Sequence, residues 1–458
     1  MLKFKWETEF KETEIGEIPR DWEIKEVKDL VDKTLKFPIV DGPFGTQLHM
    51  DEYTSEGVPV IRVINLSFEG EFIEDDLVFI SEEKFNTLKR SSVKPNDLII
   101  AKTGATIGKL ALLPEHINQG LIASSCLKVT FDFKKAIPKF YLYFFMTQVG
   151  QESIKNRAEG GSTRDTINLT PFSEIPVPLP PLPEQTRVAN VLSYFDNLIK
   201  NKRRQNEILE KTAMAIFKSW FIDFEPFRAC PEQERGNYEF VYNEELGKEI
   251  PKGWEVKRLG EVVKTFKGIS YKSAEKYQEY IEGGYIFITL DNFVRGGGFK
   301  TEYSWIKSER IKPSHLVREG DLIIALTDMT QNTQVVGAPA IVILPNGFDG
   351  GVISLDCMKI ESIVENLKYY LYMFLKDTQE DNSTFANGVN VLHLMVNNFL
   401  TGKIIFIPPP HILQSFHSLI EPLFQKIILN QKQIMTLRKI RDTLLPLLVF
   451  GKLRVEEI

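Results

Sequence analysis

Cysteine is scarce in this chain: Cys126, Cys230 and Cys357 are the only three among 458 residues. They lie too far apart for a metal knuckle or a Cys-x-x-Cys pair, and their odd number argues against a framework of disulfides. Long apolar runs are also missing, since none approaches the roughly 18 to 20 residues of a membrane span. Residues 1–7 (MLKFKWE) lack the apolar core of a signal peptide. We therefore expect a soluble, cytoplasmic protein that makes no contact with a membrane.

An excess of basic residues is absent too. The net charge is −6 at pH 7, whereas a protein that binds nucleic acid without help usually carries a basic surface that neutralises phosphates. Any role on DNA therefore has to rest on local basic patches or on partner proteins.

Catalytic and metal-binding motifs are not found. Residues 103–110 (TGATIGKL) resemble a phosphate-binding loop, but one residue too few separates the glycines and no Ser or Thr follows the lysine. The six histidines form no His-Glu-x-x-His arrangement for zinc. The Asn-Pro-Pro-aromatic motif with which DNA amino-methyltransferases hold a flipped adenine does not occur either. The sequence predicts no catalytic residue and no metal site, and any chemistry is expected in other subunits.

What the chain does contain is an internal repeat. Residues 18–25 (IPRDWEIK) are matched by 250–257 (IPKGWEVK), and residues 96–101 (NDLIIA) by 320–325 (GDLIIA). Two long copies do not fit a solenoid, which stacks many short ones. A duplicated domain is the better interpretation, and such a protein suits a target that itself has two halves.

The first copy also places Asp97 shortly before Lys102, a pair faintly similar to the acidic and lysine residues of metal-dependent nucleases. The second copy has Asp321 but Leu326 where a lysine would be needed. A strand that starts after a turn therefore explains both copies better than a nuclease site does.

A long helical pattern follows each copy, after the proline-rich residues 179–183 (LPPLP) and 407–410 (IPPP). Apolar residues alternate at spacings of four and three, which is typical of a coiled-coil seam. Helices of about 35 residues would each be about 50 Å long. The first seam comprises Val188, Leu192, Phe195, Ile199, Leu209, Ala213, Ile216 and Trp220, with polar Lys202 and Asn206; the second comprises Leu413, Phe416, Ile420, Leu423, Ile427, Ile434, Leu437, Leu444 and Leu448, with polar Asn430 and Arg441.

These two helices are expected to pack antiparallel on each other. Pro422 lies inside the second pattern and is expected to start the main helix or to kink it. The alternative is that both are interior helices of a larger domain. The proline runs and the polar seam residues favour exposed, paired rods.

Two globular segments, residues 15–180 and 243–409, mix strand and helix patterns. Short β-rich runs are separated by turns rich in Gly and Asn, and a helix comes late in each segment. We expect an α/β (mixed α+β) fold, with each domain built on a curved sheet that has its loops on one side. The clearest strands are residues 58–63, 97–101 and 285–290, and the late helices are residues 140–146 and 367–373.

Several separate motifs, spread over essentially the whole chain, resemble those of the specificity subunits of Type I restriction-modification systems. Residues 13–23 (TEIGEIPRDWE) are similar to the family's usual opening, and residues 179–185 (LPPLPEQ) and 217–224 (FKSWFIDF) resemble the start and end of its central helix. The remaining matches resemble loops of its target recognition domains: residues 41–48 (DGPFGTQL), 102–109 (KTGATIGK), 325–331 (ALTDMTQ) and 335–340 (VVGAPA).

The resemblance implies a non-catalytic subunit with two target recognition domains, each reading one half of a bipartite, asymmetric site in double-stranded DNA. The helices set the spacing and dock two methylation subunits, and restriction subunits join outside. This chain then holds no cofactor, because the partners use S-adenosylmethionine, ATP and Mg²⁺. The implied parts are a first recognition domain (1–180), a central conserved helix (181–225), a second recognition domain (226–409) and a C-terminal conserved helix (410–458).

The sequence departs from the repeat at one place. Residues 410–414 (PHILQ) stand where the first copy has residues 181–185 (PLPEQ). Docking at the two ends of the helices is therefore expected to be unequal.

Base readout requires Arg or Lys for guanine and Asn or Gln for adenine, on loops that enter the major groove. The alternative for each candidate is a turn residue that binds its own backbone. The two domains differ here, KTGAT against LTDMT, so we expect two unlike half-sites. If both domains approach the same face of B-DNA, the centres of the half-sites lie about one helical turn, or roughly 10 base pairs, apart. The candidates are Gln47, Lys102, Thr103, Thr106, Lys109, Ser162, Thr163 and Arg164 in the first domain, and Asp328, Thr330, Gln331, Asn332, Gln334, Asn387 and Asn390 in the second.

Two other hypotheses stay open. One is an enzyme with an unrecognised motif, which the purified protein would reveal with a metal ion or a labelled methyl donor. The other is a scaffold whose globular halves no longer read DNA. Unchanged duplex binding after replacement of Arg164 and Gln331 by Ala would favour the scaffold.

Overall fold

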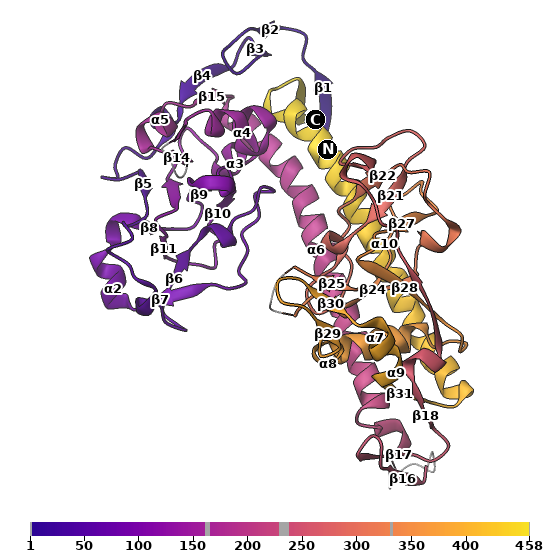
Figure 1. Ribbon diagram of the computed structural model, residues 1–458. Helices are drawn as coiled ribbons and strands as arrows, with labels where there is room; N and C mark the ends of the chain where they lie inside the picture. The colour runs from indigo at the N-terminus through magenta and orange to yellow at the C-terminus, as the bar shows by residue number, and fades with distance from the viewer. Residues whose placement is uncertain (1, 161–164, 229–237, 330–332, 458) are drawn as a thin grey trace. The chain divides into compact units, whose positions relative to one another are not determined.

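The computed structural model describes residues 2–160, 165–228, 238–329 and 333–457. The chain forms two compact units (Figure 1). The first unit comprises Met1–Asn197 with Arg438–Ile458, and the second comprises Leu198–Leu437. Each unit therefore holds one copy of the repeat together with one end of each long helix. No helix among the described residues is both long enough and apolar enough to cross a bilayer.

The two long helices are α6 (Leu182–Phe221) and α10 (Pro410–Val449), each of 40 residues. Helix α10 runs without interruption through Pro422, so the expectation that this proline starts the helix is wrong. Ile420 and Phe424 are buried on either side of the proline. Their packing holds the helix together where proline removes one backbone hydrogen bond.

The helices run antiparallel within each unit, as predicted. In the first unit, Leu192 near the start of α6 shares a core with Leu448 near the end of α10. In the second unit, Phe217 near the end of α6 lies with its ring centroid 6.4 Å from that of Phe416 near the start of α10. The predicted apolar seam is therefore the packing surface of the pair.

The polar residues of the seam bind one another across it. Asn430 is fully buried and donates to Asn206 Oδ1 at 2.8 Å, while Lys202 donates to Asn430 Oδ1 at 3.2 Å. In the first unit, Arg441 forms an ion pair of 2.9 Å with Asp196. Buried polar pairs of this kind fix the register of two helices, because a slip leaves them without partners.

The first unit combines short helices with small sheets. Its strands and helices are β1 (Leu2–Trp6), β2 (Phe10–Lys11), β3 (Ile18–Pro19), β4 (Glu23–Glu26), α1 (Val27–Leu30), β5 (Ile39–Asp41), β6 (Val58–Ile61), β7 (Val78–Ile80), α2 (Glu82–Thr87), β8 (Ser92–Val93), β9 (Leu98–Ala101), β10 (Leu110–Leu112), β11 (Gly120–Ile122), β12 (Cys126–Val129), α3 (Pro138–Met146), α4 (Gln148–Lys155), β13 (Ala158–Gly160), β14 (Asp165–Ile167), α5 (Leu169–Ser173), β15 (Pro176–Leu179) and β32 (Leu453–Glu457).

The second unit repeats this plan. Its strands and shorter helices are β16 (Phe240–Asn243), β17 (Lys248–Pro251), β18 (Glu255–Arg258), β19 (Val263–Lys267), β20 (Lys276–Tyr277), β21 (Tyr285–Ile288), β22 (Ser304–Ile306), β23 (Leu316–Val317), β24 (Leu322–Ala325), β25 (Thr327–Asp328), β26 (Pro339–Ile341), β27 (Gly351–Ile353), β28 (Cys357–Ser362), α7 (Lys368–Asp377), α8 (Gln379–Ser383), β29 (Ala386–Asn387), β30 (Leu392–Leu394), α9 (Val396–Gly402) and β31 (Ile404–Ile407).

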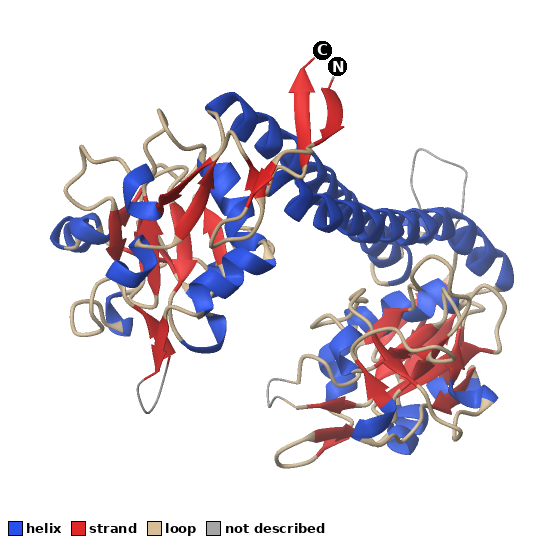
Figure 2. Cartoon of the chain, turned by 90° about the horizontal axis from the view of Figure 1, so that it is seen from above, coloured by secondary structure: helices blue, strands red, loops and turns tan. Residues whose placement is uncertain are grey.

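Sheet topology confirms the duplication. The order β10-β9-β12-β5 in the first unit corresponds to β26-β24-β28-β19 in the second, and β7-β6-β11-β8 corresponds to β22-β21-β27-β23, to which β20 adds a fifth strand beside β22. In both units the central pair of the latter sheet is parallel, β11 with β6 and β27 with β21. Each domain is a mixed helix-and-strand fold, as expected, although it has two larger sheets rather than one (Figure 2).

An ion pair sits at the same place in each copy, buried in the first unit and partly exposed in the second. Asp97 is 1% exposed and accepts from Lys128 Nζ at 3.2 Å and from Thr130 Oγ1 at 2.6 Å. Its counterpart Asp321 pairs with Lys359 at 3.1 Å. The aspartate before the LIIA strand is therefore bound by a lysine on the neighbouring strand, and it does not form the nuclease-like pair with residue 102.

The two chain ends pair with each other in the first unit, where β1 and β32 form an antiparallel ribbon (Figure 2). Arg454 on β32 binds Glu7 at 2.8 Å, Asp21 at 3.1 Å and Glu184 Oε2 at 2.7 Å. Trp22 Nε1 also donates to Glu184, at 3.1 Å. The ion pairs of Arg454 with three carboxylates thus join the start of α6 to both ends of the chain.

The matching place in the second unit has different chemistry. Leu413 stands where the first copy has Glu184, and Trp254, the counterpart of Trp22, packs among aromatic rings such as Phe221 at 5.8 Å and Phe406 at 5.8 Å. Its buried Nε1 has no hydrogen-bond partner among the described residues. The departure noted between the two proline-rich motifs therefore has a structural counterpart.

Candidate nucleic-acid interface

In the first unit, the loop between β9 and β10 carries four of the predicted DNA-binding residues. Its base is closed by a backbone hydrogen bond of 3.2 Å from Gly108 N to Ala101 O. Thr103 forms an antiparallel bridge with Thr166 on β14. Strands β13 and β14 pair as a hairpin whose connection contains Ser162, Thr163 and Arg164, which lie outside the described residues. The structure thus brings the loop and this hairpin together.

The side chains of this loop are largely engaged within the domain. Lys102 donates to Asp41 Oδ2 at 3.0 Å, and Thr106 donates to the carbonyl of Thr103 at 2.8 Å. Lys109 Nζ lies 5.9 Å from the centroid of the exposed Phe68 ring. Lys102 and Thr106 therefore shape the loop in the free protein, as turn residues do.

Gln47 lies on a neighbouring loop that follows β5, the strand that ends at Asp41. Its side chain is exposed and its Oε1 accepts from Phe44 N at 3.1 Å. The ion pair between Asp41 and Lys102 joins the bases of the two loops. Gln47 thus closes its own turn while facing outward.

In the second unit, the loop between β24 and β26 includes β25, which joins the hairpin β29–β30 in the order β25-β30-β29. Asp328 pairs with Leu392 in this sheet. Asn387 and Asn390 are exposed at the hairpin turn. Asp328, Asn387 and Asn390 therefore lie in or next to one small sheet. Gln334 is exposed on the same loop, whereas Thr330, Gln331 and Asn332 lie outside the described residues.

Asp328 has a different place from the other candidates. Its side chain is 2% exposed and its Oδ2 accepts from Val335 N at 2.9 Å. This hydrogen bond spans the loop and holds its shape. The alternative of a turn residue that binds backbone describes Asp328 in this structure, because a buried carboxylate cannot face a DNA base.

His393 was not predicted and belongs to the same surface. It lies on β30 between Thr327 of β25 and Asn387 of β29, and it is exposed. Its neighbour Leu394 is 6% exposed. The alternation of Leu, His and Leu on a strand would have placed the histidine on the outer face, but a lone histidine without ligand spacing gives no functional signal.

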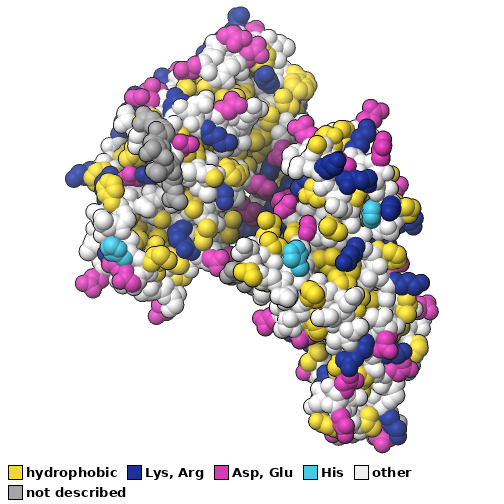
Figure 3. Space-filling model, viewed as in Figure 1, with side chains coloured by type: hydrophobic (Ala, Val, Ile, Leu, Met, Phe, Trp, Pro, Cys, Tyr) yellow, Lys and Arg dark blue, Asp and Glu magenta, His cyan; other side chains and the backbone are white. Residues whose placement is uncertain are grey.

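Neither a metal centre nor a reactive thiol is found among the described residues. No group of three or more His, Cys, Asp or Glu side chains among them is arranged to hold a metal ion. Burial raises the pKa of the Cys126 and Cys357 thiols to about 12, so neither is a thiolate near neutral pH. Basic and acidic side chains are interspersed over the face of the molecule in Figure 3.

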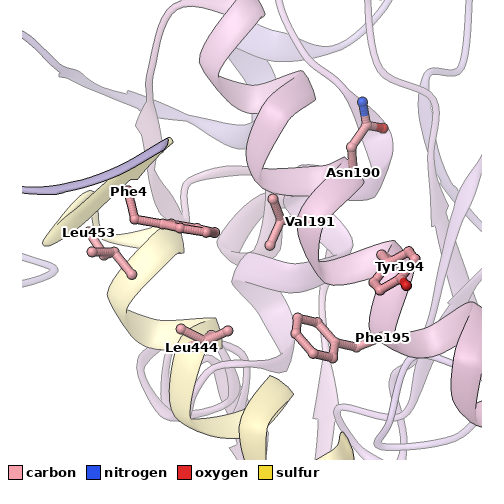
Figure 4. A pocket seen from close by; sticks show the side chains of 7 residues that line it. All are labelled: Phe4, Asn190, Val191, Tyr194, Phe195, Leu444 and Leu453. Atoms are coloured by element: carbon pink, nitrogen blue, oxygen red, sulfur yellow. The ribbon is translucent and has the colours of Figure 1, made fainter. Parts of the chain in front are cut away.

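A separate apolar groove lies on the helix pair in the first unit (Figure 4). It has a volume of about 640 Å³. Phe4 and Tyr194 are 46% and 62% exposed although both are aromatic. Among the described residues, no charged side chain lines the groove. The lining residues come from both helices and from the terminal strands: Phe4, Asn190, Val191, Tyr194, Phe195, Leu444 and Leu453.

Comparison with known proteins identifies the family. The model of the Type I restriction modification DNA specificity domain matches residues 19–211 and 251–439, one match in each copy of the repeat. The MjaIX specificity subunit of Methanocaldococcus jannaschii is 38% identical over 100% of this chain and 99% of its own length. The HindI specificity subunit of Haemophilus influenzae is 22% identical over 80% of this chain and 88% of its own length.

A solved structure agrees in fold. The S subunit of a Type I restriction-modification system from M. genitalium superposes with a TM-score of 0.52 at 18% identity, covering 93% of this chain and 96% of that subunit. The chain therefore belongs to the family of type I restriction-modification DNA specificity subunits, in which it recognises DNA sequence and does not itself catalyse a reaction.

Proposed function

We propose that the two recognition domains each read one half of a bipartite, asymmetric site in double-stranded DNA. The observation that carries this proposal is the repeated surface of a loop joined to a hairpin: Thr103 with β14 in the first unit and β25 with β30 in the second. Both are loops anchored to sheet strands and to a neighbouring hairpin, which is how proteins position side chains for base edges.

The two surfaces differ in their side chains. The first loop carries lysines and threonines, whereas the second unit presents Asn387, Asn390 and His393 on its hairpin. Lysine donates to guanine and asparagine pairs with adenine. Unlike side chains on the proposed reading surfaces of the two units favour unlike half-sites.

The helices set the distance between the half-sites in this proposal. Supporting it are the uninterrupted 40-residue lengths of α6 and α10 and the buried Asn206–Asn430 pair, which resists slippage.

The partners are two methylation subunits, with restriction subunits in the full complex. We place one docking site in the apolar groove of the first unit. Its occupant is an amphipathic helix of a methylation subunit, because a groove between helices with no charged lining accepts a row of apolar side chains. In the second unit, the corresponding end of the helix pair has Leu413 in place of Glu184. This end docks the other methylation subunit with a different affinity.

In this proposal the catalytic subunits, and not this chain, bind the cofactors. S-adenosylmethionine, ATP and Mg²⁺ belong to the partner subunits, and this chain holds none. The methylation subunits also supply part of the grip on the DNA phosphates, which accounts for the net charge of −6. The assembly works in the cytoplasm, where the DNA is.

Replacing Asn387 and Asn390 together by Ala tests the reading of one half-site. The variant is expected to lose sequence preference in the second half-site only, by about tenfold per lost bidentate contact. Both residues are exposed, so stability is expected to change little. Competition binding with duplexes degenerate in either half measures the effect.

The matched control is Asn398→Ala, the same substitution at an exposed position of α9 in the same unit. Equal preference in the double variant and the control would contradict the assignment of the hairpin. Binding of the wild type with no sequence preference at all would support the scaffold hypothesis instead.

Replacing Tyr194 by Glu tests the docking groove. The charge is expected to weaken binding of the methylation subunit at least tenfold, since desolvating a carboxylate in an apolar interface costs more than about 2 kcal/mol. Isothermal titration of the full chain measures it, with Lys134→Glu, an exposed position of the same unit, as the control. Unchanged affinity in the Tyr194 variant would move the docking site elsewhere.

A further inference from the structure

One amide side chain binds the end of the base-reading loop of the first unit and joins it to the core of the domain. Gln151 on α4 donates from Nε2 to the carbonyl of Gly108 at 2.9 Å and to the carbonyl of Phe145 at 2.8 Å. Gly108 ends the loop, and Phe145 lies in the last turn of α3. Both hydrogens of one neutral –NH₂ group thus join the loop to the aromatic helix in the core.

The second unit has the same arrangement with a different residue. Asn382 on α8 donates from Nδ2 to the carbonyl of Gly337 at 3.1 Å and to the carbonyl of Leu375 at 2.7 Å. Gly337 occupies the place of Gly108, since its N donates to Ala325 O at 2.9 Å and so closes the base of its own loop. Asn382 is fully buried.

The backbone hydrogen bond made by the residue that carries the amide is also the same in both units. Gln151 N donates to Thr147 O, and Asn382 N donates to Thr378 O, both at 2.9 Å. Each of the two amide side chains therefore belongs to the first turn of the short helix that follows the aromatic helix. Glutamine is one methylene longer than asparagine, and the amide nitrogen reaches the equivalent carbonyl in both units although the side chains differ.

The glycines fit this contact closely. Gly108 and Gly337 have φ angles of +93° and +75°, which L side chains rarely adopt. A Cβ on Gly108 would lie 2.3 Å from Gln151 Oε1, and one on Gly337 would lie 2.8 Å from Asn382 Cβ. The amide and the glycine form one unit of packing in each domain.

We propose that Gln151 and Asn382 are positioning residues for sequence readout: each fixes the end of its base-reading loop, and so the stringency of its own half-site. We call this pair of contacts the amide clamp. The inference rests on the proposed reading of two half-sites by these loops. Only a neutral amide serves in this place, because it supplies two donors to two carbonyls without burying a charge.

The longer loop of the second unit is bound by one further side chain. Gln379, also on α8, donates from Nε2 to the carbonyls of Thr333 at 2.8 Å and Val336 at 3.0 Å. With Asp328 bound to Val335 N, the loop is held at several points between β25 and Gly337. The clamp in the second unit is therefore reinforced by Gln379.

The test uses the full chain in complex with the methylation subunit from its own genome and maps adenine methylation on a genomic DNA library. In Gln151→Met, methylation of sites with one mismatch in the first half-site is expected to rise about tenfold relative to the correct site, the effect of losing one well-placed base contact. Stringency at the second half-site is expected to stay unchanged.

The matched control is Gln148→Met on the same helix, whose amide donates instead to the exposed Glu152 at 2.8 Å. The mirror variants are Asn382→Leu and Gln379→Met, which are expected to relax the second half-site only. Asn382 is fully buried and Gln379 is 8% exposed, so thermal unfolding of each variant is measured alongside, and the variant that keeps the wild-type unfolding temperature carries the mirror test.

Relaxation confined to one half-site supports the amide clamp, since a general loss of stability would loosen both halves. Unchanged stringency in Gln151→Met and Gln379→Met, or equal relaxation of both halves, would overturn it while a two-part wild-type motif still stood. A wild-type complex that methylates no two-part motif would instead overturn the proposed function itself.

Discussion

Inserting one heptad into both long helices is expected to lengthen the gap between the half-sites by about three base pairs and to leave both half-site sequences unchanged. Seven residues add about 10 Å to a helix, and successive base pairs of DNA are about 3.4 Å apart. A heptad also falls only about 20° short of two full turns, so the insertion turns one recognition domain only slightly relative to the other.

The buried polar pairs of the seam determine where the two heptads are inserted. Residues added after Asn197 in α6 and before Arg438 in α10 leave the Asp196–Arg441 pair in the first unit and the Asn206–Asn430 pair in the second. Methylation mapping reports gap and half-sites together. A heptad in α6 alone is the control, because it misaligns one buried pair. An unchanged gap or an altered half-site in the double insertion would contradict the ruler.

Replacing Lys128 by Met is expected to destabilise the first recognition domain by about 3–5 kcal/mol. The substitution leaves Asp97, which is 1% exposed, as a buried carboxylate without its cation. Chemical denaturation followed by tryptophan fluorescence measures the first unfolding transition. Adding Asp97→Asn is expected to recover most of the loss, since the buried charge is then gone.

Two lysines serve as controls for this prediction. Lys134→Met removes an exposed lysine of the same unit and is expected to change stability little. Lys359→Met breaks the equivalent pair, but Lys359 and Asp321 are 14% and 23% exposed at their side chains, so a smaller loss is expected. A loss below about 1 kcal/mol in Lys128→Met would mean that water reaches Asp97.

The helices were predictable because their signal is local and repeated. Seam residues such as Leu192 and Phe416 are buried where the spacing placed them, and the LIIA strands and aromatic helices occur as expected. Pro422 does not start the helix, which was one of the two alternatives offered for it, because packing on both sides outweighs the local propensity of proline. The polar seam residues were noted only as interruptions of the apolar stripe, and their partners, Asn430 for Asn206 and Asp196 for Arg441, emerge from the structure.

The interface was predictable only by residue type and loop. The sequence pointed to the loops that the structure joins to hairpins, but it could not give the direction of a side chain. Gln47 and Asp328 bind their own turns, and Gln151 has no sequence signal because its partners are backbone carbonyls. The ties that Arg454 makes to Glu184 and Glu7 join parts of the chain that are far apart, and no local pattern reports them.

The most direct test of the two-domain account is to express this chain with the methylation subunit from its own genome and to map methylated adenines by single-molecule sequencing. The account predicts one motif with two unlike halves, separated by a non-specific gap of fixed length. A palindromic motif would contradict the asymmetry of the two domains, and a stable complex that methylates no defined motif would contradict sequence readout by this chain.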